Sequence, residues 1–425
     1  MQATTPFIRC LLLGLLFASG PVAGADDTAG LGASLDGLLH YAREHSPVLN
    51  GARLDAEAAR ERAGAAGALP DPRLRIEWMD ITRGETRNAS LLPGRVGSTR
   101  YSLMQDLPWP GKRGLERDIA AAEATAAGDS ASATWSALAT AIRTRQLQRW
   151  FLVRDAGVLA EMAALLASLE HTAQARYANG LAAQQDVIRA QLEQTGVRNQ
   201  QIALAGEQRR LEAELNTLLG RPAREPLLEP AGIAPLPPVD ALDFARLAGR
   251  VDAGNPRLQA DSALSRAAGH ARDRVRRERY PDFSLGLSPV QYDQSIREWE
   301  LMLELNIPLQ RRARRARERE SEARLARAEA RLSDTRQELL GELDARLAAL
   351  ASARRTLELL EGSLLPQAEL TLVAARAGYE AGQVDFSTLL DAQKQILQAR
   401  LDQHQADLAA RLELAEIDRL AGVAP

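Results

Sequence analysis

The chain is poor in several residue types, and each shortage narrows the classes of protein to which it can belong. Only 4% of its 425 residues are aromatic, and Cys10 is the single cysteine. One cysteine cannot form an intrachain disulfide. No window of 18 consecutive apolar residues occurs, so no transmembrane helix is expected. The net charge of −3 gives no sign of a nucleic-acid-binding protein.

Residues typical of catalysis and metal binding are also scarce. The five histidines are scattered, and His40 and His45 are five residues apart, whereas a spacing of four puts two ligands on one helical face. The methionines form no cluster, and there is no Ser-His-Asp set, phosphate-binding loop or GxGxxG motif. We therefore expect a protein that is not an enzyme, with no catalytic residue, no metal site and no cofactor.

Residues 1–25 have the features of a secretory signal peptide. Arg9 precedes the apolar segment CLLLGLLFA (10–18), and AGA (23–25) has the small-x-small pattern of a cleavage site. Cys10 begins the apolar segment instead of following it, so we expect no lipid anchor and no cysteine in the mature chain. The alternative is an uncleaved N-terminal anchor.

The remaining sequence shows an internal duplication. Pro47 and Pro256 begin similar segments 209 residues apart, QDLP (105–108) corresponds to LNIP (305–308), and YANGLAAQQDVIRAQ (177–191) corresponds to YEAGQVDFSTLLDAQ (379–393). These marks occur in the same order at nearly constant offset. We predict a first repeat over 26–220, a proline-rich linker over 221–240 and a second repeat over 241–425.

Each repeat has the same predicted order of elements, which is a helix, a β-hairpin, a long helix, a glycine-marked turn and a final helix. The ranges are 47–68, 72–108, 111–178 and 186–219 in the first repeat, and 256–279, 282–308, 310–379 and 383–420 in the second. Ala, Leu, Arg, Glu and Gln dominate the composition, which is typical of long helices. A helix over 111–178 would be ~100 Å long at ~1.5 Å per residue. The fold is therefore expected to be mainly α with a small β part.

The last predicted strand alternates strictly between apolar and polar residues. One face carries Trp299, Leu301, Leu303, Leu305 and Ile307, and the other carries Glu298, Glu300, Met302, Glu304 and Asn306. This pattern fits either a soluble sheet covered by helices or a membrane β-barrel with an apolar outside and a polar lumen lined by Glu298, Glu300 and Glu304. A secreted chain with three glutamates on one strand face favours the barrel. Four strands cannot close a barrel, so several chains would be required, and a trimer would supply twelve strands.

The duplicated order of elements, the central linker and the paired Y-x-x-G turns resemble the TolC family of outer membrane efflux proteins. The resemblance implies a homotrimer, with a twelve-stranded β-barrel in the outer membrane of Gram-negative bacteria that continues into a periplasmic α-helical barrel. Such a protein is a passive channel in a tripartite efflux system, with a periplasmic adaptor (membrane fusion) protein and an inner-membrane pump of the resistance–nodulation–division type. QDLPWPGKR (105–113) is similar to the signature of the branch that exports heavy-metal cations, the cobalt–zinc–cadmium group. The alternatives are a multidrug or type I protein-secretion channel of the same fold and, more remotely, a periplasmic coiled-coil adaptor or scaffold.

The resemblance also implies roles for residues at the tips of the long helices. The Y-x-x-G turns would lie at the periplasmic end, where the adaptor docks, and they hold Tyr177, Asn179, Gly180, Tyr379, Ala381 and Gly382. The family's gate can carry two acidic rings three residues apart. Asp391 fits one ring, Thr388 stands where the other would be, and Asp385 and Asp186 lie nearby in the two repeats. We expect Asp391 to line a constriction that favours cations.

The proline-rich corner before each long helix is expected at the membrane interface. In the first repeat it comprises Pro108, Trp109, Pro110, Gly111, Lys112 and Arg113, and in the second Pro308, Arg311 and Arg312. The prolines stop strand pairing, and Trp109 is an interfacial aromatic residue. Cations at a helix N-terminus oppose the helix dipole. We therefore predict that Lys112, Arg113, Arg311 and Arg312 face the phosphates of outer membrane lipid.

Overall fold

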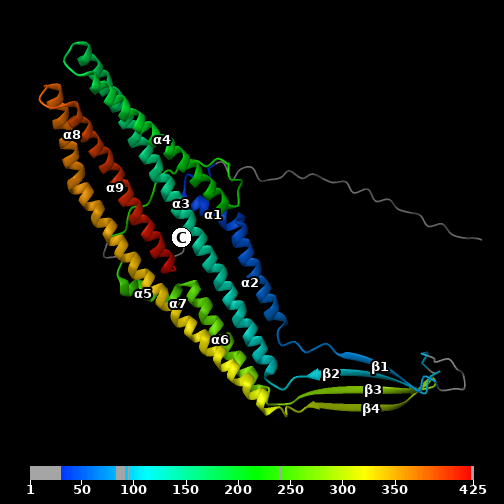
Figure 1. Ribbon diagram of the computed structural model, residues 1–425. Helices are drawn as coiled ribbons and strands as arrows, with labels where there is room; N and C mark the ends of the chain where they lie inside the picture. Colours follow the sequence, from blue (N-terminus) through cyan, green and yellow to red (C-terminus); the bar gives the residue numbers. More distant parts are fainter. Residues whose placement is uncertain (1–29, 83–90, 94, 239–241, 423–425) are drawn as a thin grey trace, which may run out of the picture.

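The computed structural model of the protein describes residues 30–82, 91–93, 95–238 and 242–422. The segment expected to be a signal peptide, 1–25, lies outside these residues. The described chain is elongated, with long helices along one arm and four strands extending from its lower end (Figure 1). The fold is mainly helical with one small antiparallel sheet, as the sequence predicts.

The elements follow the predicted duplication in their order. The first repeat contains α1 (Leu35–His45), α2 (Pro47–Ala65), β1 (Arg73–Met79), β2 (Ser98–Leu107), α3 (Lys112–Ala178) and α4 (Gln184–Leu219). The second contains α5 (Phe244–Gly254), α6 (Pro256–Arg277), β3 (Asp282–Tyr292), β4 (Ser295–Asn306), α7 (Arg311–Leu359), a π-helical turn η2 (Leu360–Leu364), α8 (Leu365–Glu380) and α9 (Phe386–Leu420). None of the helices among the described residues is long and apolar enough to cross a membrane.

Two short helices, α1 and α5, precede the helices predicted to begin each repeat. Each starts at a side-chain cap. Ser34 Oγ accepts a hydrogen bond from the Gly37 amide, and Asp243 Oδ2 accepts one from the Arg246 amide. Each repeat therefore contains one more helix than predicted, within the ranges 26–220 and 241–425.

The second long helix is interrupted, whereas the sequence predicts one helix over 310–379. The π-helical turn η2 separates α7 from α8, and Pro366 lies in the first turn of α8. Proline lacks an amide hydrogen and clashes with the carbonyl group of the preceding turn, which disfavours a regular helix through this point. A π-helical turn accommodates such a break with one extra residue.

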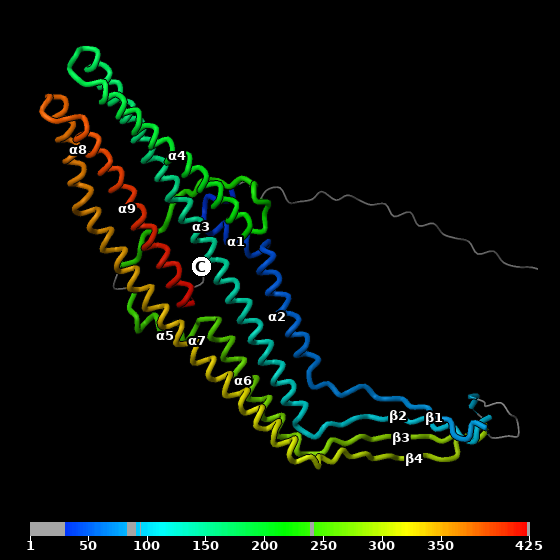
Figure 2. Tube along the Cα trace, viewed as in Figure 1, coloured from blue at the N-terminus to red at the C-terminus, as the bar shows by residue number. Residues whose placement is uncertain are grey.

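The shorter helices pack along the long ones, as expected from their lengths. In Figure 2, α3 runs from the strands to the opposite tip, with α2 and α4 following one another along it. In the second repeat, α6 and α9 pack along α7. Near the tips, a buried stripe of α3 repeats at spacings of three and four residues and consists of Leu159, Met162, Leu166, Leu169 and Ala173.

The proline-rich linker lies against the helices of both repeats. Arg149 of α3 is buried and donates a hydrogen bond to the Leu228 carbonyl oxygen at 3.0 Å, and Arg354 of α7 donates one to the Pro237 carbonyl oxygen at 2.6 Å. Burial lowers the pKa of Arg149. These contacts fix the linker on the two long helices.

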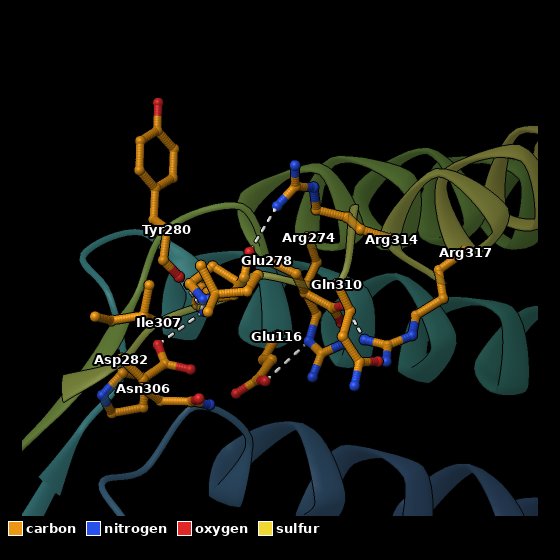
Figure 3. Close-up of a pocket in the computed structure, with 14 residues that line it drawn as sticks. Glu116, Arg274, Glu278, Tyr280, Asp282, Asn306, Ile307, Gln310, Arg314 and Arg317 are labelled. Carbon is orange, nitrogen blue, oxygen red and sulfur yellow. Dashed lines mark hydrogen bonds and ion pairs between the residues drawn. The ribbon is translucent and has the colours of Figure 1, made fainter. Parts of the chain in front are cut away.

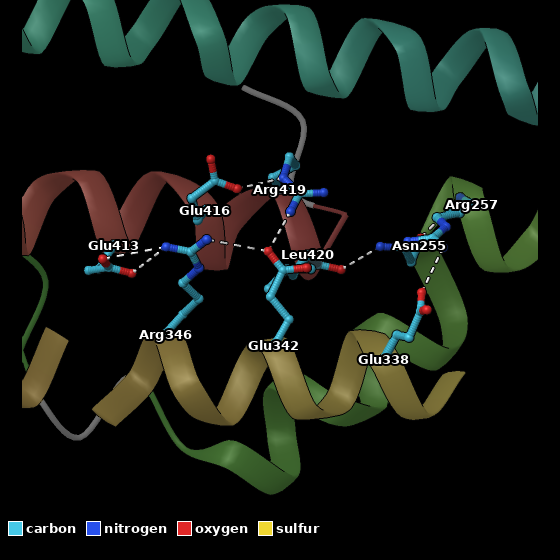
Figure 4. A network of polar contacts seen from close by, with 9 residues as sticks. All are labelled: Asn255, Arg257, Glu338, Glu342, Arg346, Glu413, Glu416, Arg419 and Leu420. Atoms are coloured by element: carbon cyan, nitrogen blue, oxygen red, sulfur yellow. Dashed lines mark hydrogen bonds and ion pairs between the residues drawn. The ribbon is translucent and has the colours of Figure 1, made fainter. Parts of the chain in front are cut away.

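A polar network joins the end of α9 to α7 at mid-length (Figure 4). Arg346 contacts Glu413 at 3.2 Å and Glu342 at 3.6 Å, and Arg419 contacts Glu342 at 3.0 Å. Beside it, Asn255 caps α6 and donates a hydrogen bond to the Leu420 carbonyl oxygen at 3.0 Å. The network holds the C-terminal helix in place close to the linker.

The sheet has the order β1-β2-β3-β4, and all neighbours are antiparallel. The contact between β2 and β3 joins the two repeats, with Leu103 opposite Leu287. A β-bulge at Val290 and Gln291 interrupts the otherwise regular pairing of β3 and β4. Both predicted hairpins are thus part of one continuous sheet.

Candidate functional site

The apolar face of the sheet is exposed along its whole width. Trp299, Leu301 and Leu303 are 66%, 78% and 59% exposed. Leu305 and Ile307 continue this face along the chain, and the other strands add the exposed side chains of Leu74, Ile76, Leu103, Leu285 and Leu287. No helix of the described chain packs over the sheet. The alternative of a soluble sheet covered by helices therefore does not hold.

The opposite face is polar and cross-linked by charged pairs. Arg100 contacts Glu300 at 3.1 Å and Glu77 at 3.5 Å. Asp106 accepts hydrogen bonds from Arg73 at 2.7 Å and from Ser284 at 2.6 Å. The three predicted lumen residues, Glu298, Glu300 and Glu304, all extend from β4 on this face.

Both edge strands of the sheet are open. Each of β1 and β4 pairs with one neighbouring strand among the described residues. An open edge leaves backbone amide and carbonyl groups without partners, which is very unfavourable in hydrocarbon. A sheet with this exposed apolar face can therefore lie in a bilayer only if other strands cover both edges.

The apolar band has the height expected for a bilayer. From Trp299 in β4 to Ile307, the residue that follows β4, the chain advances eight residues, or ~27 Å at ~3.4 Å per residue. A tilt of ~40° reduces this to ~21 Å across the membrane, close to the ~25 Å apolar band of outer membrane barrels. Leu303 lies at the middle of the band.

The corner between the strands and helices is held by contacts between the two repeats. Trp109 stacks on Tyr280, with ring centroids 5.0 Å apart and planes 9° apart. Asp282 accepts hydrogen bonds from the Trp109 backbone amide at 2.7 Å and from Lys112 Nζ at 2.8 Å. The motif 105–113 is thus fixed to the start of β3.

Gly111 is required by the geometry of this corner. Its φ is 89°, a left-handed conformation that residues with a side chain seldom adopt. A Cβ atom would lie 1.8 Å from Arg277 Nη1, and the same Arg277 donates a hydrogen bond to the Pro110 carbonyl oxygen at 3.1 Å. The arginine therefore occupies the space left by the missing side chain.

The four predicted interface cations fall into two groups. Lys112 is buried and pairs with Asp282, and Arg113 donates a hydrogen bond to the Gly67 carbonyl oxygen at 2.7 Å. Arg311 and Arg312 are exposed, and their side chains have no partner among the described residues. In contrast to the expectation, Lys112 faces inward, because β3 of the other repeat supplies a carboxylate beside it.

A cavity of about 470 Å³ lies at the corner, and half of the residues that line it are charged (Figure 3). Ion pairs cross its wall, with Arg274 contacting Glu116 at 2.9 Å and Arg317 contacting Glu278 at 2.9 Å. Ile307 and Pro308 line its strand side. The cavity therefore lies where the apolar sheet meets the charged ends of the helices.

The two helical tips have similar backbones but different surroundings. Gly180 and Gly382 have φ values of 70° and 72° and end α3 and α8. Tyr177 is 48% exposed, whereas Tyr379 is 5% exposed, and burial raises the pKa of the Tyr379 phenol. Arg176 donates a hydrogen bond to the Tyr379 carbonyl oxygen at 3.0 Å and lies 4.8 Å from the centroid of its ring. Arg176 thereby joins the first tip to the second. Asn179 and Ala381, the other predicted tip residues, are exposed caps.

Three gate candidates lie on one side of the start of α9, with Asp385 as its N-cap residue. Asp385, Thr388 and Asp391 are all exposed and follow each other at intervals of three residues. None of these three side chains bonds to another described residue, whereas Asp186 on α4 is half-buried. This stripe is free to face a neighbouring chain or a lumen.

Sequence reasoning missed four residues that fix these sites. Arg277, Tyr280 and Asp282 hold the corner, and Arg176 joins the tips. Each acts on residues about 170 to 200 positions away along the chain. Long-range pairs of this kind leave no local pattern, so no signal in the sequence could have identified them. No three His, Cys, Asp or Glu side chains of the described chain gather closely enough to hold a metal ion.

Comparison with known proteins agrees with this geometry. Residues 247–423 match the family model described as "Outer membrane efflux protein". The matched segment falls within the second repeat. Among curated proteins, none matches the sequence.

Solved structures have the same fold over nearly the whole chain. CusC is 18% identical with a TM-score of 0.77, and the match covers 99% of both chains. The outer-membrane channel OprN is also 18% identical with a TM-score of 0.77, covering 97% of this chain and 98% of OprN. VceC from Vibrio cholerae is 19% identical with a TM-score of 0.76, covering 91% of this chain and 96% of VceC. The family match and the shared fold support the predicted location in the outer membrane.

Proposed function

We propose that the protein is the outer membrane channel of a tripartite efflux system. The observation that carries the proposal is the sheet, which has an exposed apolar face, a charged opposite face and two open edges. The match of residues 247–423 to outer membrane efflux proteins supports it. A passive channel needs no catalytic residue and no cofactor, in line with the lack of such motifs in the sequence.

We infer that three chains close the barrel. Four strands per chain give eight strands in a dimer and twelve in a trimer. A barrel of eight strands has an interior that side chains nearly fill, so it leaves little room for a conduit. A trimer is therefore the smallest closed assembly with an open lumen, and β4 of one chain would pair with β1 of the next.

Exposed apolar residues on the helices support contacts between chains beyond the barrel. Ile188, Leu192 and Ile202 of α4 are 56–67% exposed, and Leu370 and Val373 of α8 are 70% and 66% exposed. Because α4 belongs to the repeat of β1 and α8 follows β4, both stripes can be buried when neighbouring chains pair through their sheet edges. The helices would then continue the barrel as a periplasmic tunnel.

We propose that the partners are a periplasmic adaptor at the helical tips and an inner-membrane pump of the resistance–nodulation–division type. The tips lie at the opposite end of the molecule from the strands (Figure 1). The turns at Asn179-Gly180 and Ala381-Gly382 are exposed and therefore available to a partner. In the trimer, the exposed Asp391 side chains would form a constriction that favours cations.

For the exported substrate, we propose heavy-metal cations. The motif QDLPWPGKR and the glutamates of the lumen face support this choice. The alternative substrates are drugs or secreted proteins, which channels of the same fold could carry.

The test is the growth of a deletion strain on zinc, cobalt, cadmium, copper and a panel of drugs, with and without the cloned gene. We expect the deletion to lower metal tolerance and the gene to restore it. Loss of drug tolerance alone would overturn the metal assignment and leave the channel assignment standing. A protein that fractionates without membranes and forms no pore would contradict the channel assignment.

A further inference from the structure

The corner between sheet and helices is strongly basic, although the whole chain is slightly acidic. The segments 112–117, 272–279 and 311–319 together hold 14 Lys or Arg and 4 Asp or Glu residues, a net charge of +10, whereas the chain carries −3. They form the start of α3, the end of α6 and the start of α7, which pack together. An anionic partner would complement this region.

Part of this positive charge is neutralised within the chain. Lys112 pairs with Asp282, Arg274 with Glu116 and Arg317 with Glu278, all at 2.8–2.9 Å (Figure 3). These carboxylates lie in the wall of the corner cavity. The inward-facing cations thus have partners and contribute to the fold.

The outward-facing cations lack such partners. Arg311, Arg312 and Arg315, which we call the corner cluster, are exposed, and none of their side chains bonds to another described residue. Arg311 and Arg315 are four residues apart, so they lie on one face of α7, and Arg312 is beside them. The first turn of α7 contains no acidic residue. Cations there also oppose the helix dipole, so the cluster is stabilised only if an external anion approaches.

The position of the cluster identifies that anion. Ile307 and Leu309, which directly precede it, are 66% and 80% exposed and end the apolar band of β4. The cations therefore begin within a few residues of the place where hydrocarbon would end. The stacked pair of Trp109 and Tyr280 lies at the same level, as aromatic girdles do in membrane barrels.

We propose that the corner cluster binds the phosphate groups of phospholipids in the leaflet that faces the helical arm. The inference rests on the proposed function, since it requires the sheet to lie in a membrane. In a trimer, nine arginines would surround the barrel at this level. Their role is to fix the depth of the barrel in the membrane, and it is independent of what passes through the lumen.

The test compares the full-length protein with Arg311→Gln/Arg312→Gln/Arg315→Gln in vesicles of phosphatidylcholine with increasing phosphatidylglycerol. Brominated forms of the two lipids quench tryptophan fluorescence, and the ratio of quenching gives the preference for the anionic lipid at the protein surface. The matched control is Arg198→Gln/Arg209→Gln/Arg355→Gln, because these arginines are also exposed, their side chains bond to no other described residue, and they lie on helices far from the sheet. A second variant, Arg311→Lys/Arg312→Lys/Arg315→Lys, keeps the positive charge at the three positions.

We expect the wild type and the control to prefer phosphatidylglycerol, and this preference to vanish at high salt. Each basic residue near an anionic membrane surface raises the affinity for that surface about fivefold. We therefore expect the preference for phosphatidylglycerol to be at least about tenfold lower in the glutamine variant than in the wild type. The lysine variant should keep most of the preference. An unchanged preference in the glutamine variant, or no preference in the wild type, would overturn the inference. Pore conductance in phosphatidylcholine alone, measured in parallel, separates this outcome from failure of the channel itself, which would abolish conductance in every vesicle.

Discussion

Leu303 offers the sharpest test of which face of the sheet meets lipid. It lies at the middle of the apolar band, is 59% exposed and is paired with Leu285. In an assembled barrel, Leu303→Arg would place a guanidinium group near the centre of the bilayer. Such a substitution costs about 2–4 kcal/mol per chain at the midplane. Because each chain of a trimer carries the change, the assembled channel bears that cost three times.

The control is the next residue along the strand. Glu304 lies on the polar face, opposite Ser284, and close to Asp106 in the same row. Glu304→Arg introduces the same side chain at almost the same depth, but toward the lumen. We expect its effect on stability to be within about 1 kcal/mol, since an arginine there remains in water and gains a carboxylate neighbour.

The assay is urea unfolding of the protein in phosphatidylcholine vesicles, together with the amount of heat-resistant oligomer in outer membranes. We predict a clear loss of stability and of oligomer for Leu303→Arg and near wild-type values for Glu304→Arg. Equal effects of the two substitutions, or a larger effect of Glu304→Arg, would refute the assignment of the lipid face.

Three further substitutions test the corner, the tips and the gate. Gly111→Ala should lower the free energy of unfolding in urea by about 1–3 kcal/mol, because the added methyl group collides with Arg277. The loss should be smaller in an Arg277→Ala background. Additive effects of the two substitutions would argue against the collision. Arg176→Ala should broaden the distance distribution between spin labels on the two tips, since two hydrogen bonds to backbone carbonyl groups are lost, and an unchanged distribution would show that the arginine does not join them. Asp391→Asn should lower the preference for cations in single-channel recordings. The control, Asp344→Asn at an exposed position on α7, should leave the preference unchanged. Equal selectivity of the wild type and both variants would show that Asp391 does not line the constriction.

Local patterns in the sequence were sufficient for the architecture. The alternation from Trp299 to Ile307 predicted both the strand and its two faces, because side chains alternate strictly along a strand. The proline-free run after Pro110 predicted α3 within one residue at its start, since proline is the main interruption of long helices. Repetition of the same order in both halves strengthened each assignment.

Contacts between the repeats were beyond the reach of sequence patterns. The inward orientation of Lys112 depends on Asp282, which lies 170 residues away, and the position of Arg277 over Gly111 spans a similar distance. The helices α1 and α5 were missed although Ser34 and Asp243 mark their starts, because each is short and lies beside a proline that begins the next helix. The π-helical turn before Pro366 was missed because the surrounding residues favour a continuous helix.

Closure of the sheet between chains is the central claim, and disulfide trapping tests it most directly. Ile76 on β1 is changed to cysteine together with Leu301, Leu303 or Leu305 on β4, so that the series scans the register between neighbouring edges. The only native cysteine, Cys10, lies within the segment expected to be removed as a signal peptide. After oxidation in membranes, we predict that one member of the series gives covalent products that end at the trimer, because each chain then joins the next around a closed ring. Products that stop at the dimer, a ladder that continues beyond three chains, or no cross-link at any register would contradict the account.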